Sequence, residues 1–117
     1  QVVVVLDDSL IKMADVSSGM PEGGLVLVNT ASPGKDGFGL RDDLRVAGVD
    51  ADEIAYRLEL GGPPYPHINT LMLAAFCKLT GLVSLETVCR AAQERFPSGH
   101  DRVERGMREA YERASFL

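Results

Sequence analysis

The sequence lacks tryptophan altogether and has only two cysteines and two histidines among its 117 residues. The cysteines, Cys77 and Cys89, each stand alone on an apolar position of a helical pattern. Because zinc and iron–sulfur sites need several cysteines or histidines at close spacing, we predict no metal site and no cofactor bound by the chain alone. We expect two reduced, buried thiols, which are typical of a cytoplasmic protein.

Basic clusters and long apolar runs are missing as well. Lysine and arginine number 12 against 17 aspartates and glutamates, which gives a formal net charge of −5. Nucleic acids and anionic membrane surfaces both select for clustered positive charge, so we expect neither as a partner. With 45% apolar and 25% charged residues, the composition is that of a globular protein, and the length fits a single domain, residues 1–117.

The stretch 69–81, NTLMLAAFCKLTG, has almost no polar face. After its first turn only Lys78 is strongly polar, and a helix that is apolar on nearly all sides is buried on several of them. The stretch is too short to span a bilayer, which needs about 20 residues. We therefore predict a central helix that Asn69 caps and Gly81 ends, with a sheet on one side and other elements on the other.

Short runs rich in β-branched residues predict three strands, at residues 2–6, 25–28 and 44–49. The first two are continuous apolar runs, as in strands of a parallel sheet that are buried on both faces. Because a sheet rarely begins so abruptly, we expect residues upstream of Gln1 to be missing from this chain. A short helix at residues 10–14, capped by Asp8 or Ser9, is expected after the first strand.

Residues 31–42, ASPGKDGFGLRD, predict a flexible loop, because glycine and proline interrupt every regular pattern. A dinucleotide-binding glycine loop would join a strand to a helix, whereas this segment runs into the strand at residues 44–49. We therefore reject a phosphate-binding role for the loop.

The rest of the second half predicts three further helices with apolar stripes at helical spacing. Asp50 and Glu53 form a capping box for a helix that ends at Gly61, and Ser84 caps the next helix. The last helix, about residues 100–114, carries acidic and basic residues four apart on a face that we expect to be solvated. The pairs are Glu104–Arg108, Arg105–Glu109 and Arg108–Glu112.

Polar residues follow two of the predicted strands, Asp7 and Asp8 after the first and Asn29 and Thr30 after the second. Open α/β sheets bind ligands at the carboxyl ends of their strands, so Asn29 and Thr30 are our candidate cofactor-binding residues. Asp8 and Asn29 also have competing local uses, as a helix cap and a turn cap.

The two histidines, His67 and His100, flank loops and have no partnered serine or cysteine nucleophile nearby in sequence. We expect structural or solvent-facing roles for both and predict no catalytic residue. The chain is therefore predicted to be an α/β domain without a self-contained active site. Its small, mainly parallel sheet is expected to be packed by helices in a three-layer, Rossmann-like arrangement.

Several segments together resemble a known family. They are VVVVLDDSL, PEGGLVLVNT, VAGVDADEIA and, most specifically, NTLMLAAFCKLTGLVSLETVCRAAQERF. These segments resemble the gamma subunit, or gamma-type domain, of the pyruvate and other 2-oxoacid:ferredoxin oxidoreductases, over most of residues 1–114. The chain departs from the family in lacking the glycine-rich N-terminal half that precedes its first strand, which would complete the fold.

The resemblance implies a multisubunit enzyme that oxidatively decarboxylates a 2-oxoacid such as pyruvate with coenzyme A and passes the electrons to ferredoxin. Thiamine diphosphate and the iron–sulfur clusters are then held by alpha, beta and delta-type subunits or domains. The gamma-type part packs against these and, in some members, helps to hold coenzyme A. We thus expect an oligomeric assembly in which this chain is not active alone.

Two other functions stay open from the residues. One is a stand-alone nucleotide- or flavin-binding α/β module, which would need a phosphate-binding turn after a strand, and no such turn is present in the sequence. The other is a purely structural assembly subunit, which no feature of the sequence excludes.

Overall fold

The computed structural model describes residues 1–62 and 65–117 of the chain. The helices are α1 (Leu10–Met13), α2 (Ala51–Arg57), α3 (Asn69–Thr80), α4 (Leu85–Arg95) and α5 (His100–Arg113). The strands are β1 (Val2–Val5), β2 (Leu25–Asn29), β3 (Arg45–Val49), β4 (Gly61–Gly62), β5 (Tyr65–Pro66) and β6 (Ser115–Phe116). None of the helices in this described part is long and apolar enough to cross a membrane.

The main sheet has the order β1-β2-β3-β6, and the predicted mainly parallel arrangement is confirmed. β1 pairs in parallel with β2, and β2 in parallel with β3. β6 is antiparallel to β3 and was not predicted, because two residues at the end of a helix carry no strand periodicity. β4 and β5 form a separate antiparallel pair within the segment that leads to α3.

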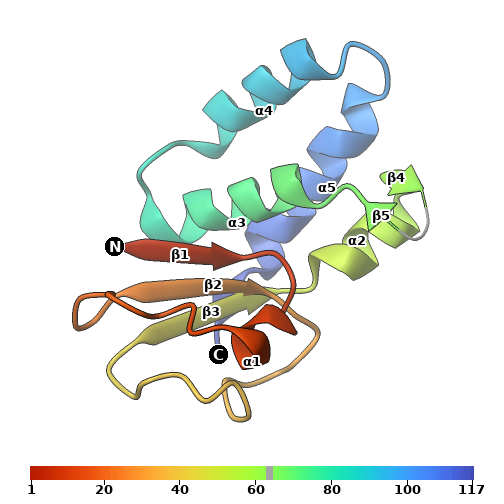
Figure 1. Cartoon of the computed structure of the whole chain (residues 1–117). Helices are drawn as coiled ribbons and strands as arrows, with labels where there is room; N and C mark the ends of the chain where they lie inside the picture. The colour runs from red at the N-terminus through yellow and green to blue at the C-terminus, as the bar shows by residue number, and fades with distance from the viewer. Residues whose placement is uncertain (63–64) are drawn as a thin grey trace.

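The sheet separates two apolar cores (Figure 1). On one side α3 and α5 cover Leu25 and Leu27 of β2, with α4 lying beyond them. On the other side Val26 and Val28 of β2 contact α1 and the long connections. The 31–42 segment has no helix or strand, as expected, and contributes partly buried apolar side chains to this second core. One of the three predicted layers is therefore built from a single-turn helix and loops.

The central helix lies where it was predicted, but one of its apolar residues faces outward. The side chains of Leu71, Met72, Ala74 and Ala75 are buried between the sheet and α5. Leu73, which was expected to be buried, is 42% exposed, because α4 packs on α5 and leaves this side of α3 uncovered.

The predicted cap of α3 was wrong. The amide of Met72 donates to the carbonyl of Ile68 at 2.9 Å, so the helix starts one residue earlier and Asn69 lies inside it. The other end is confirmed, since Gly81 has a φ of 66° and its amide donates to the carbonyl of Cys77. Only glycine adopts this left-handed conformation without strain.

The capping of α2 and α4 was predicted correctly, but the end of α2 was not. Asp50 accepts a hydrogen bond from the amide of Glu53 at 3.1 Å, and Ser84 accepts one from the amide of Thr87 at 3.1 Å. α2 ends at Arg57 rather than at Gly61, and Glu59 already takes a left-handed conformation with a φ of 56°.

The short helix α1 is confirmed, but neither of its predicted caps acts as one. Ser9 occupies the N-cap position and makes no capping hydrogen bond. Instead, Asp7 accepts hydrogen bonds from the amide and the hydroxyl of Ser9, at 3.0 and 2.8 Å. The carboxylate of Asp8 accepts a hydrogen bond from Thr30 rather than from an amide of the helix.

The charged face of α5 is a set of links between helices, not simply a solvated face. Arg108 pairs with Glu104 as predicted, at 3.3 Å, and also with Glu86 of α4 at 3.0 Å. Glu109, predicted to pair with Arg105, instead accepts hydrogen bonds from Arg57 of α2. The predicted pair of Arg108 with Glu112 is replaced by these links between helices.

Candidate functional site

Asn29 ties together three elements at the carboxyl ends of the strands. It ends β2 and is only 5% exposed. Its Nδ2 donates to the carbonyl of Leu6, just after β1, at 3.1 Å and to the carboxylate of Asp52 in α2 at 3.0 Å. Its Oδ1 accepts from the amide of Ala51, the first residue of α2, at 2.9 Å. A buried amide that makes three such bonds holds its neighbours in one arrangement.

Thr30 performs a similar role one residue later. Its hydroxyl donates to the carboxylate of Asp8 at 2.7 Å and accepts from the amide of Ser32 at 3.1 Å. Its methyl group would lie 3.1 Å from a β-carbon placed on Gly48, so a side chain on β3 at this point would push against Thr30. Thr30 thus joins the exits of β1 and β2 to the start of the 31–42 segment.

The surroundings of these two residues are acidic. Asp8 and Asp52 each accept a hydrogen bond from the buried pair, and Asp7 lies beside Asp8 in sequence. The hydroxyl of Ser9, and then its amide, donate to Asp7 and lower the pKa of that carboxyl below its ordinary value. An edge of this kind offers hydrogen-bond acceptors, and it suits ligand groups that donate hydrogen bonds better than it suits phosphates.

The structure therefore brings together Asp8, Asn29 and Thr30, as the sequence suggested. It adds Asp52 in the first turn of α2, which was not among the residues predicted for the site. The signal was present in the sequence, since a carboxylate after the third strand must lie beside the ends of the first two in a parallel sheet.

The two histidines do not belong to this cluster of strand-end residues. The amide of His67 donates to the carbonyl of Leu60 at 2.9 Å, and its ring packs so closely on Gly61 that a β-carbon there would lie 2.9 Å away. His100 starts α5, with its Nε2 3.3 Å from the carboxylate of Asp101. Neither histidine is hydrogen-bonded to the strand-end residues.

Both cysteines are buried and unlinked, as predicted. Burial raises the pKa of the thiols of Cys77 and Cys89, so neither is favoured as a thiolate ligand or nucleophile. Among the described residues, no group of three or more histidine, cysteine, aspartate or glutamate side chains is placed to hold a metal ion.

The comparison with known proteins is decisive for the family. The profile described as pyruvate ferredoxin/flavodoxin oxidoreductase matches residues 1–114. The chain belongs to this family. The resemblance of its segments to this family is thereby confirmed, and the relatives below confirm the gamma-type part.

Relatives of this chain include proteins named as PorC or gamma subunits. It is 40% identical over 112 residues, 95% of its length, to the pyruvate synthase subunit PorC of Methanothermobacter marburgensis. It is also 40% identical over 116 residues to the common subunit gamma of the pyruvate/ketoisovalerate oxidoreductases of Pyrococcus furiosus. The chain spans 58% and 60% of the lengths of these two relatives.

A solved structure confirms the fold of this family member. The crystal structure of the pyruvate oxidoreductase subunit PORC from Thermotoga maritima superposes with a TM-score of 0.79 at 30% sequence identity. The superposition covers 98% of the present chain and 64% of that one.

Proposed function

We propose that this chain is the gamma-type part of a 2-oxoacid:ferredoxin oxidoreductase that decarboxylates a 2-oxoacid such as pyruvate in a coenzyme A-dependent reaction. The observation that carries the proposal is the family match over residues 1–114, supported by 40% identity to a PorC subunit. The chain itself supplies no catalytic group and acts only within the assembled enzyme, in the cytoplasm.

The open edge of β1 supports an assembly role. The amide of Leu25 donates to the carbonyl of Gln1 at 3.0 Å, and backbone groups alternate in direction along a strand. The amides and carbonyls of Val2 and Val4 therefore point away from β2, and no described strand pairs with them. An edge without charge, proline or bulge is a ready partner for another chain.

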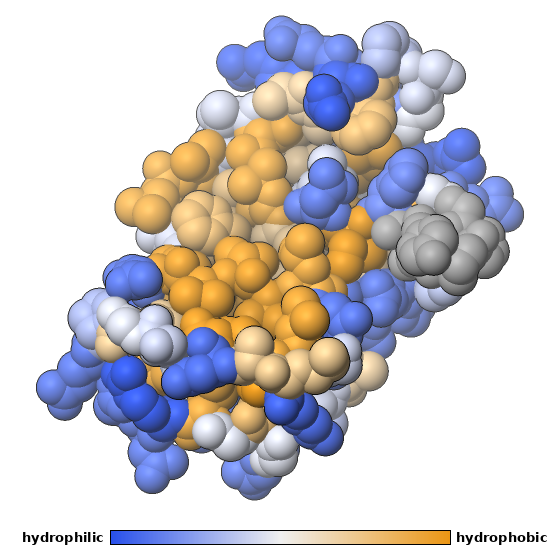
Figure 2. All heavy atoms as spheres, viewed as in Figure 1, coloured by the Kyte–Doolittle hydropathy of each residue, from blue (hydrophilic) through white to orange (hydrophobic). Residues whose placement is uncertain are grey.

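An apolar surface surrounds this edge (Figure 2). Large apolar side chains of β1, α1, α3 and the α3–α4 connection are exposed, namely Val4, Leu6, Leu10, Leu73, Leu82 and Val83. Contiguous apolar surface of this kind marks interaction sites in soluble proteins. We propose that the β1 side of it packs against alpha, beta or delta-type subunits, or against further parts of a gamma-type chain.

The cofactors of the assembled enzyme belong to those partners. The alpha, beta and delta-type parts hold thiamine diphosphate and the iron–sulfur clusters, and the clusters pass the electrons to ferredoxin. Two separate, buried cysteines with raised pKa values support this division. Asn29 and Thr30 stay predicted cofactor-binding residues, and their hydrogen bonds support an indirect role in which they position the strand ends that the amide and amino groups of coenzyme A, rather than its phosphates, approach.

A graft tests the proposal. Residues 1–114 replace the matching part of PorC in the M. marburgensis pyruvate synthase, and the enzyme is purified with its other subunits. We expect pyruvate- and coenzyme A-dependent reduction of ferredoxin, with a preparation lacking PorC as the inactive control. An intact but inactive complex would refute the function, and stoichiometric flavin on the chain alone would favour the nucleotide-binding alternative.

Thr30→Val separates the proposal from a purely structural subunit. In the grafted enzyme it should raise the KM for coenzyme A while the complex stays assembled, with Ser32→Ala as the control in the neighbouring loop. Unchanged kinetics would assign the strand-end residues to folding alone.

A further inference from the structure

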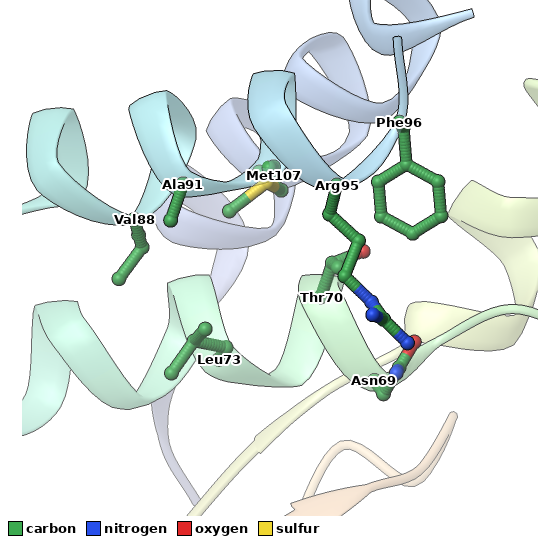
Figure 3. A pocket seen from close by; sticks show the side chains of 9 residues that line it. Asn69, Thr70, Leu73, Val88, Ala91, Arg95, Phe96 and Met107 are labelled. Atoms are coloured by element: carbon green, nitrogen blue, oxygen red, sulfur yellow. The ribbon is translucent and has the colours of Figure 1, made fainter. Parts of the chain in front are cut away.

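A groove of about 350 Å³ lies between α3 and α4 (Figure 3). Most of its surface is apolar, formed by Leu73, Val88, Ala91, Ala92, Phe96 and Met107. Its volume is in the range of small-molecule sites, which are mainly apolar with a few polar groups that orient the ligand.

The groove follows from how α4 is held. α4 turns its buried side chains toward the core and is bound to α5 by the Arg108–Glu86 pair at 3.0 Å. Opposite α3 it presents the small side chains of Ala91 and Ala92, so the floor residue Leu73 stays 42% exposed. Covering an apolar side chain of this size is favourable, so an apolar occupant would be stabilised here.

The polar residues gather at one end of the groove. Arg95 reaches from the last turn of α4 toward Asn69 at the start of α3, with Thr70 beside it (Figure 3). Arg95 is the sole charged residue among the described residues that line the groove. Within the described part of the chain it makes no ion pair or side-chain hydrogen bond, although the protein as a whole has a net charge of −5.

We propose that this groove binds a small amphiphilic carboxylate. The apolar part of the ligand lies on Leu73 and Val88, and its carboxylate accepts hydrogen bonds from the guanidinium of Arg95 and the side-chain amide of Asn69. A planar guanidinium fork matches the two oxygens of a carboxylate, and one cation balances a monoanion. Because Arg95 crosses from α4 toward α3 and closes that end, the groove fits a short ligand better than a continuous helix of a partner.

Octanoate binding to the intact chain tests the proposal, with octanamide as the uncharged probe of equal length. Amide chemical shifts should change at Leu73, Val88 and Ala91, with a dissociation constant in the millimolar range or tighter. We expect Arg95→Gln to weaken octanoate binding about tenfold, equivalent to about 1.4 kcal/mol, and to leave octanamide binding unchanged. Arg90→Gln, which removes the same charge from α4 outside the groove, should change neither.

A second variant tests the apolar half. Ala91 is exposed on α4, so Ala91→Phe should keep the fold while its ring fills the groove. We expect this variant to lose both probes. Shift changes confined to β1, equal losses in Arg90→Gln and Arg95→Gln, unimpaired binding by Ala91→Phe, or no octanoate binding would each overturn the proposal. The last result would favour a polypeptide as the natural occupant.

Discussion

Asn29 ends a strand and also links three elements through the hydrogen bonds of its side chain. Its three hydrogen bonds connect the exits of β1 and β2 to the first turn of α2. Each hydrogen bond contributes little to the net free energy of folding. A buried group that loses its partner, however, lowers the stability by about 1–3 kcal/mol. The arrangement of the strand ends therefore depends on the side-chain amide of Asn29 far more than on the exposed residues around it.

We expect Asn29→Ala to lower the free energy of unfolding by about 2–3 kcal/mol, because the amide of Ala51 loses its partner in a buried position. Urea denaturation followed by circular dichroism measures this. Lys35→Ala, in the exposed part of the 31–42 loop, is the control and should cost under about 0.5 kcal/mol. A similar small loss in both variants would contradict the assigned role of Asn29.

Arg41 and Asp43 give a pH-dependent prediction at the same scale. The guanidinium of Arg41 donates to Asp43 at 2.9 Å and lowers the pKa of that carboxyl from 3.8 to about 2. Because the folded pKa is the lower one, the pair stabilises the fold above about pH 4, and this contribution is lost as the pH falls toward 2.

Arg41→Gln should raise the Asp43 pKa toward its ordinary value, as measured by NMR titration of the side-chain carboxyl. Lys35→Gln removes a charge from the same loop without touching Asp43 and is the control. An Asp43 pKa that stays near 2 in Arg41→Gln would show that other groups, such as the amide of Gly23, hold it down.

At the scale of elements, α3 combines a buried body with one exposed apolar position. Ala75 is fully buried, and a charge there would lose its hydration with no partner nearby. Leu73 is partly exposed in the groove, and Lys78 donates to the carbonyl of Glu112 at 2.8 Å near the surface. Positions two or three residues apart on this helix are therefore expected to differ greatly in how well they tolerate a charged substitution.

Ala75→Asp should unfold the chain, since the cost of several kcal/mol approaches the whole stability of a domain. Leu73→Asp and Lys78→Glu should each cost about 1 kcal/mol or less. Thermal denaturation of the three variants makes the comparison. A folded, stable Ala75→Asp would mean that α3 is not the centre of the core.

The elements with strong periodicity could be predicted from the sequence, and those set by a few tertiary contacts could not. The nearly all-apolar stretch predicted α3, and the continuous β-branched runs predicted β1 and β2. β6 depends on its contact with β3, and the early end of α2 depends on a non-glycine residue with positive φ. At the candidate site the strand ends were predictable because parallel strands end together, but the three bonds of Asn29 needed coordinates.

The whole molecule has one edge of its sheet closed and the other open. β6 pairs with Ala47 and Gly48 of β3, whereas the β1 edge is uncovered within the described residues. Val4, whose backbone groups point outward there, is also 39% exposed. The chain should therefore associate through β1 when it is purified alone.

Val4→Lys should shift the chain toward monomer, because a lysine on an edge strand opposes pairing. Met13→Lys adds the same charge at a residue of α1 that is 79% exposed, and should leave association unchanged. Light scattering measures both. A monodisperse wild-type monomer would count against the role of β1 as a docking edge.

The short strand β6 has a consequence for how far such association can go. Filaments need two adhesive ends on every unit, and a two-residue edge strand such as β6 offers few backbone groups for pairing. Two copies that meet edge to edge through β1 would leave only these short β6 edges at either side, which disfavours growth beyond a pair. The short strand β6 thus limits how far association through an unpaired β1 can extend.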